Sequence, residues 1–133
     1  LIEEGYYIIF TGSKSDREKI GKFEERNNEN YVNLAGKTSL NELAAVYKRA
    51  ALYIGGDTGP THLAAALGLK VISLMGPTEP DTHGPYGKGN TVIQDNSLEC
   101  IGCWERSCSR DMQCMRLITV EQVLRIAKNK LAD

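Results

Sequence analysis

The segment of residues 52–76 constrains the fold of this chain more than any other part of the sequence. Residues 52–54 and 71–75 are short apolar runs typical of buried strands. Between them lies an Ala-rich stretch in which Pro60 suits the first turn of a helix and Gly68 is placed to end it. The pattern therefore predicts a strand, a helix and a second strand in succession, the unit from which parallel sheets are built.

The loop after the first of these strands is unusually polar. Gly55 and Gly56 are expected to let the backbone turn, and Asp57, Thr58 and Gly59 follow directly before the helix. A helix N-terminus presents unpaired N–H groups and partial positive charge, which favour an anionic ligand. Phosphate is the ligand that this arrangement indicates.

Nearby side chains can extend such a site. Thr58 and Thr61 can add hydroxyl donors, Gly59 permits close approach of the backbone, and His62 can supply a further donor near neutral pH. The alternative is structural: Asp57 or Thr58 caps the helix and His62 packs on its neighbours. Spacing alone leaves both interpretations open.

The rest of the chain continues the alternation of strands and helices. Further strands are expected at residues 6–10, 31–34 and 90–94, and further helices at 16–27, 39–47 and 119–131. Ser39 can cap its helix, with Glu42 complementing the helix dipole. The continuous apolar runs 6–10 and 71–75 are expected to be buried on both faces. The fold class predicted is α/β, a parallel sheet of four or five strands with flanking helices.

The two ends of the chain each allow a further prediction. Residues 1–5 resemble the last turn of a helix with Gly5 at its end, so we expect the chain to begin within a domain that is truncated at its N-terminus. In the last helix, four apolar residues are expected to face inward: Val120, Val123, Leu124 and Ile126.

Composition narrows the possible functions. With 133 residues, 41% of them hydrophobic, the chain is expected to form one domain over residues 1–133. Sixteen basic residues nearly balance seventeen acidic ones, so a nucleic-acid partner is not expected. No apolar run approaches the roughly 20 residues that span a bilayer, and no signal peptide opens the chain. The protein is expected to be cytoplasmic.

In open α/β sheets, ligands bind beyond the carboxyl ends of the strands. That rule is expected to gather four loops at one edge, residues 11–16, 35–39, 56–61 and 76–81. The first of them contains Gly12 and Lys14 but neither of the glycine patterns typical of nucleotide-binding loops. A nucleoside triphosphatase is therefore not favoured.

Several motifs in order carry a family resemblance. Asp57-Thr58-Gly59-x-x-His62 precedes Leu-Ala-Ala-Ala-Leu-Gly, and Gly76-Pro77-Thr78-x-Pro80, Gly84-Pro85-Tyr86-Gly87 and a cysteine-bearing tail follow. Together these resemble glycosyltransferase family 9, which includes the ADP-heptose:lipopolysaccharide heptosyltransferases. The resemblance implies the C-terminal, Rossmann-like, donor-binding half of a two-domain GT-B glycosyltransferase. The acceptor domain and an upstream phosphate-contacting loop would precede Leu1.

The resemblance also implies a reaction and a set of site residues. A nucleoside-diphosphate sugar similar to ADP-heptose would donate its sugar to a lipopolysaccharide-core acceptor, with the enzyme at most peripheral at the inner membrane face. The donor-binding positions implied are Asp16, Thr38, Asp57, Thr58, Gly59, Thr61 and His62. Asp16 would bond a ribose hydroxyl and Thr38 would border the adenine, although a helix-terminal charge and a helix cap are the respective alternatives. The general base is expected in the missing domain, so no catalytic residue and no metal ligand is named, and the fragment alone is expected to be inactive.

Four cysteines lie within fifteen residues: Cys100, Cys103, Cys108 and Cys114. Four thiolates can form a tetrahedral zinc site, although this cluster is not a pair of Cys-x-x-Cys knuckles. Free thiols, or thiols oxidised only on purification, are the alternative, since disulfides do not persist in a reducing cytoplasm. Zinc at this cluster is left open.

Two other functions of the chain also remain alternatives, a sugar-nucleotide epimerase of the same architecture and a non-catalytic nucleotide-binding domain.

Overall fold

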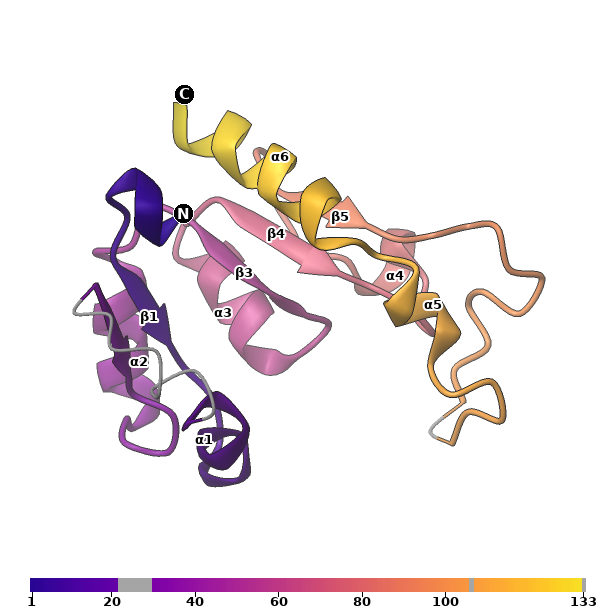
Figure 1. Cartoon of the computed structure of the whole chain (residues 1–133), viewed down its shortest axis with the longest axis horizontal. Coiled ribbons are helices and arrows are strands. Elements are labelled where there is room, and N and C mark those ends of the chain that lie inside the picture. Colours follow the sequence, from indigo (N-terminus) through magenta and orange to yellow (C-terminus); the bar gives the residue numbers. More distant parts are fainter. Residues whose placement is uncertain (22–29, 106, 133) are drawn as a thin grey trace. The chain divides into compact units, whose positions relative to one another are not determined.

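The computed structural model describes residues 1–21, 30–105 and 107–132. The chain divides into two compact units, Leu1–Ala45 and Val46–Asp133. Each unit contains its own parallel sheet, and we describe them separately (Figure 1).

The first unit is built on two parallel strands. Its elements are η1 (Ile2–Glu4), β1 (Ile8–Phe10), α1 (Lys14–Gly21), β2 (Tyr31–Asn33) and the beginning of α2 (Leu40–Tyr47). β1 pairs with β2, with Ile8 opposite Tyr31. Gly5 ends η1 at a φ of 87°, which confirms the glycine stop, although the turn is a 3-10 helix.

The expected burial of residues 6–10 is wrong. Tyr7 is 58% exposed and Ile9 is 40% exposed, whereas Ile8 and Phe10 are half-buried. Side chains alternate between the two faces of a strand, so the pattern indicates one covered face rather than two. Of the helix expected over residues 16–27, the structure gives α1 from Lys14 to Gly21, and residues 22–29 lie outside the described part.

The second unit holds a three-stranded sheet. Its elements are β3 (Tyr53–Gly56), α3 (Gly59–Ala66), β4 (Val71–Leu74), α4 (Pro80–His83), β5 (Thr91–Ile93), α5 (Gln113–Arg116) and α6 (Val120–Ala132). The strand order is β3-β4-β5 and both pairs are parallel, with Tyr53 opposite Val71 and Ile72 opposite Thr91. The predicted strand–helix–strand unit is confirmed.

A helix packs on one face of this sheet. Ile72 and Ile93 are buried against Ala127 of α6, and Val123 and Ile126 pack around them. Figure 1 shows α6 running along the sheet. Because strand side chains alternate, Val71 and Ser73 face the opposite side, and α3 contacts β3 and β4. β4 is thus buried on both faces, as its continuous apolar run predicts.

Two glycines differ from the sequence-based expectation. Gly55 and Gly56 were expected to turn the chain, but they extend β3 and pair with Ser73 and Leu74. The Tyr53 ring lies over Gly55, so that a Cβ atom built there would lie 2.7 Å from Tyr53 Cζ. Gly55 is therefore needed for close packing within a strand.

The remaining differences concern sheet size and the last helix. The five strands of the described ranges form two hydrogen-bonded sheets, of two and three strands, where one sheet of four or five was expected. Val120 is 68% exposed at the first position of α6, so its predicted inward orientation is wrong. The short helices α4 and α5 were not predicted. Within the described ranges, no helix is long and apolar enough to cross a bilayer.

Candidate functional site

The polar loop after β3 leads directly into α3. Thr58 is the N-cap residue and has extended dihedral angles, φ −147° and ψ 164°. Its carbonyl accepts hydrogen bonds from the N–H groups of Thr61 at 3.0 Å and His62 at 3.4 Å. Its hydroxyl makes no capping bond to the helix in the described structure. The side-chain cap that sequence allowed for Thr58 is therefore not formed.

The first position of the helix is open. Gly59 begins α3, and no described atom beyond its chain neighbours and its own helix backbone lies within 4 Å of where its Cβ would be. Pro60 follows and has no N–H group to donate. A ligand can thus approach the Gly59 backbone closely, at the end of the helix that favours negative charge.

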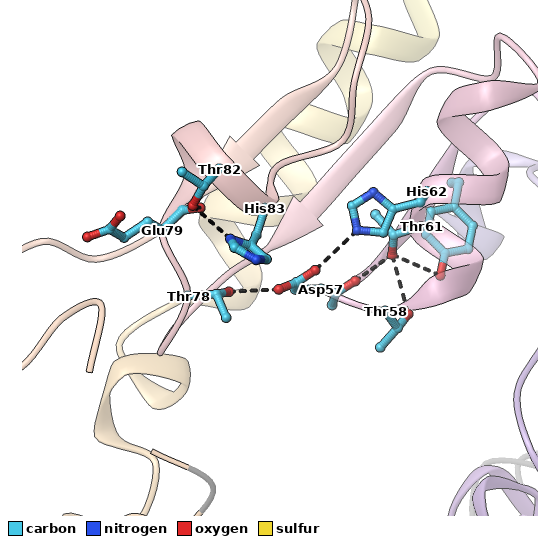
Figure 2. Close-up of polar contacts among 10 residues, drawn as sticks. Asp57, Thr58, Thr61, His62, Thr78, Glu79, Thr82 and His83 are labelled. Atoms are coloured by element: carbon cyan, nitrogen blue, oxygen red, sulfur yellow. Dashed lines mark hydrogen bonds and ion pairs between the residues drawn. The ribbon is translucent and has the colours of Figure 1, made fainter. Parts of the chain in front are cut away.

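Asp57, in the loop after β3, contacts one side chain of α3 and one of the loop after β4. Its Oδ1 lies 3.3 Å from His62 Nε2, and its Oδ2 accepts a 2.8 Å hydrogen bond from Thr78 Oγ1. Figure 2 shows the carboxylate between these two side chains. The Asp57 side chain is 21% exposed and the imidazole 46% exposed. The carboxylate is therefore held from two sides while the histidine remains accessible.

This geometry determines what each group can offer. A carboxylate only accepts hydrogen bonds, so the Asp57 contact favours the form of His62 that carries a proton on Nε2. The Nδ1 nitrogen is then left to accept a hydrogen bond or, when protonated, to donate one. The Asp57 contact therefore orients the His62 ring so that Nδ1 can bond an anion or a hydroxyl.

Thr78 was not named as a site residue from the sequence. It follows β4, the strand next to β3, and carboxyl ends of neighbouring parallel strands meet at one edge. The expectation that loops 56–61 and 76–81 share an edge, together with the Gly76-Pro77-Thr78 motif, contained the signal that could have identified it.

Thr61 has a structural contact in this arrangement. It is fully buried, and its hydroxyl donates to the Gly56 carbonyl and lies 3.4 Å from Tyr53 Oη. The Thr58 hydroxyl lies 3.5 Å from the Thr61 hydroxyl, and Thr58 is an exposed residue (Figure 2). Thr61 thus fixes the turn between β3 and α3 from inside, and Thr58 is the threonine that a ligand can reach.

The other two predicted site residues lie in the first unit. Asp16 accepts hydrogen bonds from the Ser13 N–H at 2.9 Å and the Ser13 hydroxyl at 2.6 Å. These bonds, the hydroxyl foremost, hold the pKa of Asp16 below its ordinary value. The pairing is a capping box for α1, with the Asp16 N–H 3.3 Å from Ser13 Oγ.

Thr38 lies in the loop after β2, and this loop is hydrogen-bonded to the loop after β1. The Gly36 N–H donates to the Gly12 carbonyl at 2.8 Å, so the segments that carry Asp16 and Thr38 meet at the carboxyl end of this sheet. Ser39 caps α2: its Oγ accepts from the Glu42 N–H at 3.4 Å, and in return its N–H and hydroxyl each donate to the Glu42 carboxylate at 2.7 Å. The predicted cap at Ser39 is confirmed.

The predicted positions therefore form two clusters, each at the carboxyl end of its own unit's sheet. One holds Asp16 and Thr38, and the other holds the residues from Asp57 to His62. All four cysteines are described as free thiols; Cys114 is buried and Cys103 exposed. Across the described ranges, no group of three or more His, Cys, Asp or Glu residues is arranged to hold a metal ion.

Comparisons with known proteins point to one family. The model of glycosyltransferase family 9 (heptosyltransferase) matches residues 1–113. Lipooligosaccharide heptosyltransferase 2 of Campylobacter jejuni is 29% identical over 95% of this chain and 41% of its own length. Lipopolysaccharide heptosyltransferase 2 of Escherichia coli is 33% identical over 71% of this chain and 28% of its own length.

Solved structures agree with the sequence matches. The E. coli ADP-heptose lipopolysaccharide heptosyltransferase II has a TM-score of 0.81 at 27% identity, covering 98% of this chain and 38% of that one. E. coli heptosyltransferase WaaC, solved with ADP, has a TM-score of 0.68 at 25% identity, covering 94% and 34%. The predicted α/β, Rossmann-like fold class is confirmed. The chain spans about two fifths or less of the length of these relatives.

Proposed function

This chain belongs to glycosyltransferase family 9, the heptosyltransferase family, and from that premise we propose that it is the nucleotide-sugar-binding part of a lipopolysaccharide heptosyltransferase. The donor is a nucleoside-diphosphate sugar of the ADP-heptose type. The acceptor is a hydroxyl of the lipopolysaccharide core. The observation that carries the proposal is the Asp57 carboxylate, held by Thr78 and His62 beside the open start of α3.

Transfer of the sugar requires stabilisation of the negative charge on the leaving diphosphate. When the sugar leaves through an oxocarbenium-like transition state, negative charge develops on the departing diphosphate. Three groups can donate to that charge: the Gly59 backbone at the start of α3, the hydroxyl of the exposed residue Thr58 and, when Nδ1 is protonated, the His62 imidazole. Asp57 orients His62, and Thr61 acts indirectly by fixing the turn.

The nucleotide contacts are proposed in the first unit. Asp16 is kept ionised by its Ser13 contacts, so it can accept a hydrogen bond from a ribose hydroxyl while it also caps α1. Thr38 borders the base. The E. coli relative solved with ADP supports adenosine diphosphate as the nucleotide.

Other parts of the reaction belong outside these 133 residues. Deprotonation of the acceptor hydroxyl is assigned to the acceptor domain, so no general base is placed here. Since a lipopolysaccharide acceptor carries a lipid, we infer cytoplasmic action with peripheral contact at the inner membrane face.

Substitution of His62 tests the proposal. In the full-length protein, His62→Ala should remove a charge-assisted contact worth about 1–3 kcal/mol, which lowers kcat/KM about 5- to 150-fold. Thr78→Val should have a smaller effect in the same direction, because it acts only through Asp57. Steady-state kinetics with ADP-heptose and a core acceptor give the rates.

A melting curve provides the control. Because His62 is 46% exposed, its loss should leave the Tm within the range of neutral surface variants. If His62→Ala keeps wild-type kcat/KM, or if it lowers the Tm sharply, the residue has a packing role and the proposed diphosphate site is wrong.

A further inference from the structure

Trp104 combines an unusual backbone with an accessible side chain. Its φ is 60°, in the left-handed region that bulky residues rarely occupy. Its N–H donates to the Pro77 carbonyl at 2.9 Å, which fixes this conformation. The residue is nevertheless 50% exposed. Burial in a core therefore does not account for an aromatic ring held in this position.

His83, the last residue of α4, forms a corner with this ring. The two ring centroids are 4.2 Å apart and the planes meet at 84°. The imidazole is fixed in turn, because Nδ1 lies 2.7 Å from Thr82 Oγ1 (Figure 2) and the His83 N–H donates to the Glu79 carbonyl. In the part of the chain that the structure describes, Nε2 has no hydrogen-bond partner, so it is available to a ligand.

One loop connects this corner to the candidate site. Residues 76–78 follow β4; Thr78 donates to Asp57, and Pro77 accepts the bond from Trp104. Gln94 holds the same loop, since its Nε2 donates to the carbonyls of Gly76 at 3.0 Å and Thr78 at 2.8 Å. The corner is thus fixed on the loop that also positions Asp57.

The chemistry of the corner suits a sugar ring. The face of an aromatic ring carries partial negative charge, and the C–H face of a pyranose presents partially positive hydrogens. A free imidazole nitrogen beside it can bond a sugar hydroxyl. We propose that Trp104 and His83 form a carbohydrate subsite that stacks one pyranose ring, either the transferred sugar or a saccharide of the acceptor. This inference rests on the proposed sugar transfer and adds a substrate contact to it.

The experiment compares full-length wild type with Trp104→Ala and Trp104→Phe. Calorimetry with ADP and with ADP-heptose measures the donor contact, and the KM of a lipopolysaccharide-core acceptor measures the acceptor contact. Loss of the stacking contact in Trp104→Ala should either weaken the affinity for ADP-heptose or raise the acceptor KM, in each case by roughly 3- to 10-fold. A weaker affinity for ADP-heptose assigns the subsite to the transferred sugar, and a raised acceptor KM assigns it to the acceptor. Trp104→Phe should keep most of the wild-type value, since it keeps an aromatic face.

Tyr86→Ala is the matched control, because Tyr86 is a 92% exposed aromatic residue outside the corner and should leave every value unchanged. His83→Phe keeps a ring against Trp104 but removes the free nitrogen, and should weaken the same ligand. The subsite is refuted if Trp104→Ala leaves both the ADP-heptose affinity and the acceptor KM unchanged. It is also refuted if the affinity for ADP, which carries no sugar to stack, falls by the same factor as the affinity for ADP-heptose. Absence of transfer by the wild type would instead refute the proposed function.

Discussion

At the residue scale, two glycines near the candidate site have opposite reasons for being glycine. Gly55 lies under the Tyr53 ring, which is itself packed edge-on against Tyr47 with centroids 5.2 Å apart. Gly59 begins α3, where its missing side chain leaves open space among the described residues. The first is needed by the fold, and the second is proposed to leave room for a ligand to approach.

Paired alanine substitutions should separate these roles. Gly55→Ala should overpack the Tyr53 contact and reduce the free energy of unfolding by about 1–3 kcal/mol. Gly59→Ala should leave the Tm unchanged or slightly raised, because alanine favours a helix, yet it should weaken ADP-heptose binding. Thermal melting and calorimetry on both variants make the comparison. Equal loss of stability in the two would show that the space at Gly59 is structural.

Ser13 gives a prediction about pH. Its hydroxyl and N–H lower the pKa of Asp16, so the folded carboxylate stays charged to a lower pH than the unfolded one. Such a contact stabilises the fold at pH values above the unfolded pKa, and that stabilisation disappears as pH falls through the folded pKa. Ser13→Ala should raise the pKa of Asp16 toward its ordinary value and reduce stability at neutral pH more than in acid.

An NMR titration of the Asp16 side chain and melting curves at several pH values would check this. The corresponding variant Ser39→Ala should act in the same way on Glu42, whose pKa is lowered by its bonds from the Ser39 N–H and hydroxyl. A loss of stability in Ser13→Ala that is equal at neutral and acid pH would contradict the explanation.

At the scale of elements, α6 stabilises the second unit through a few buried contacts. Ile72 is fully buried against Ala127, whereas Val120, at the first position of the helix, is 68% exposed. Ile72→Ala should cost about 2–5 kcal/mol through lost burial and a cavity. Val120→Ala should change the stability by no more than about 0.5 kcal/mol. Urea unfolding of both variants tests whether α6 is held by its inner face, and similar losses in the two would contradict it.

At the scale of the whole molecule, the chain spans about two fifths or less of its relatives' length. We expect the 133 residues alone to bind ADP weakly and to transfer no sugar, because the base that deprotonates the acceptor hydroxyl is assigned to the acceptor domain. Calorimetry with ADP and an assay with ADP-heptose and a core acceptor provide the readouts. Turnover by the isolated chain would show that the chemistry resides in this part.

The sequence by itself determined the elements whose signals are local. The apolar run of β4, the Ser39 cap and the stops at Gly5 and Gly68 depend on neighbours within a few residues, and the structure contains each of them. The Asp57–His62 motif was visible for the same reason, since its residues are consecutive.

Contacts between segments far apart in the sequence were decided only by the tertiary structure. Thr78 reaches Asp57 across 21 positions, and Trp104 meets His83 through a loop without periodicity. Likewise, whether Ile9 or Val120 is covered depends on what packs against a face, which hydrophobicity alone does not specify. Local patterns select strands and helices, but side-chain packing between them determines which residues form the site.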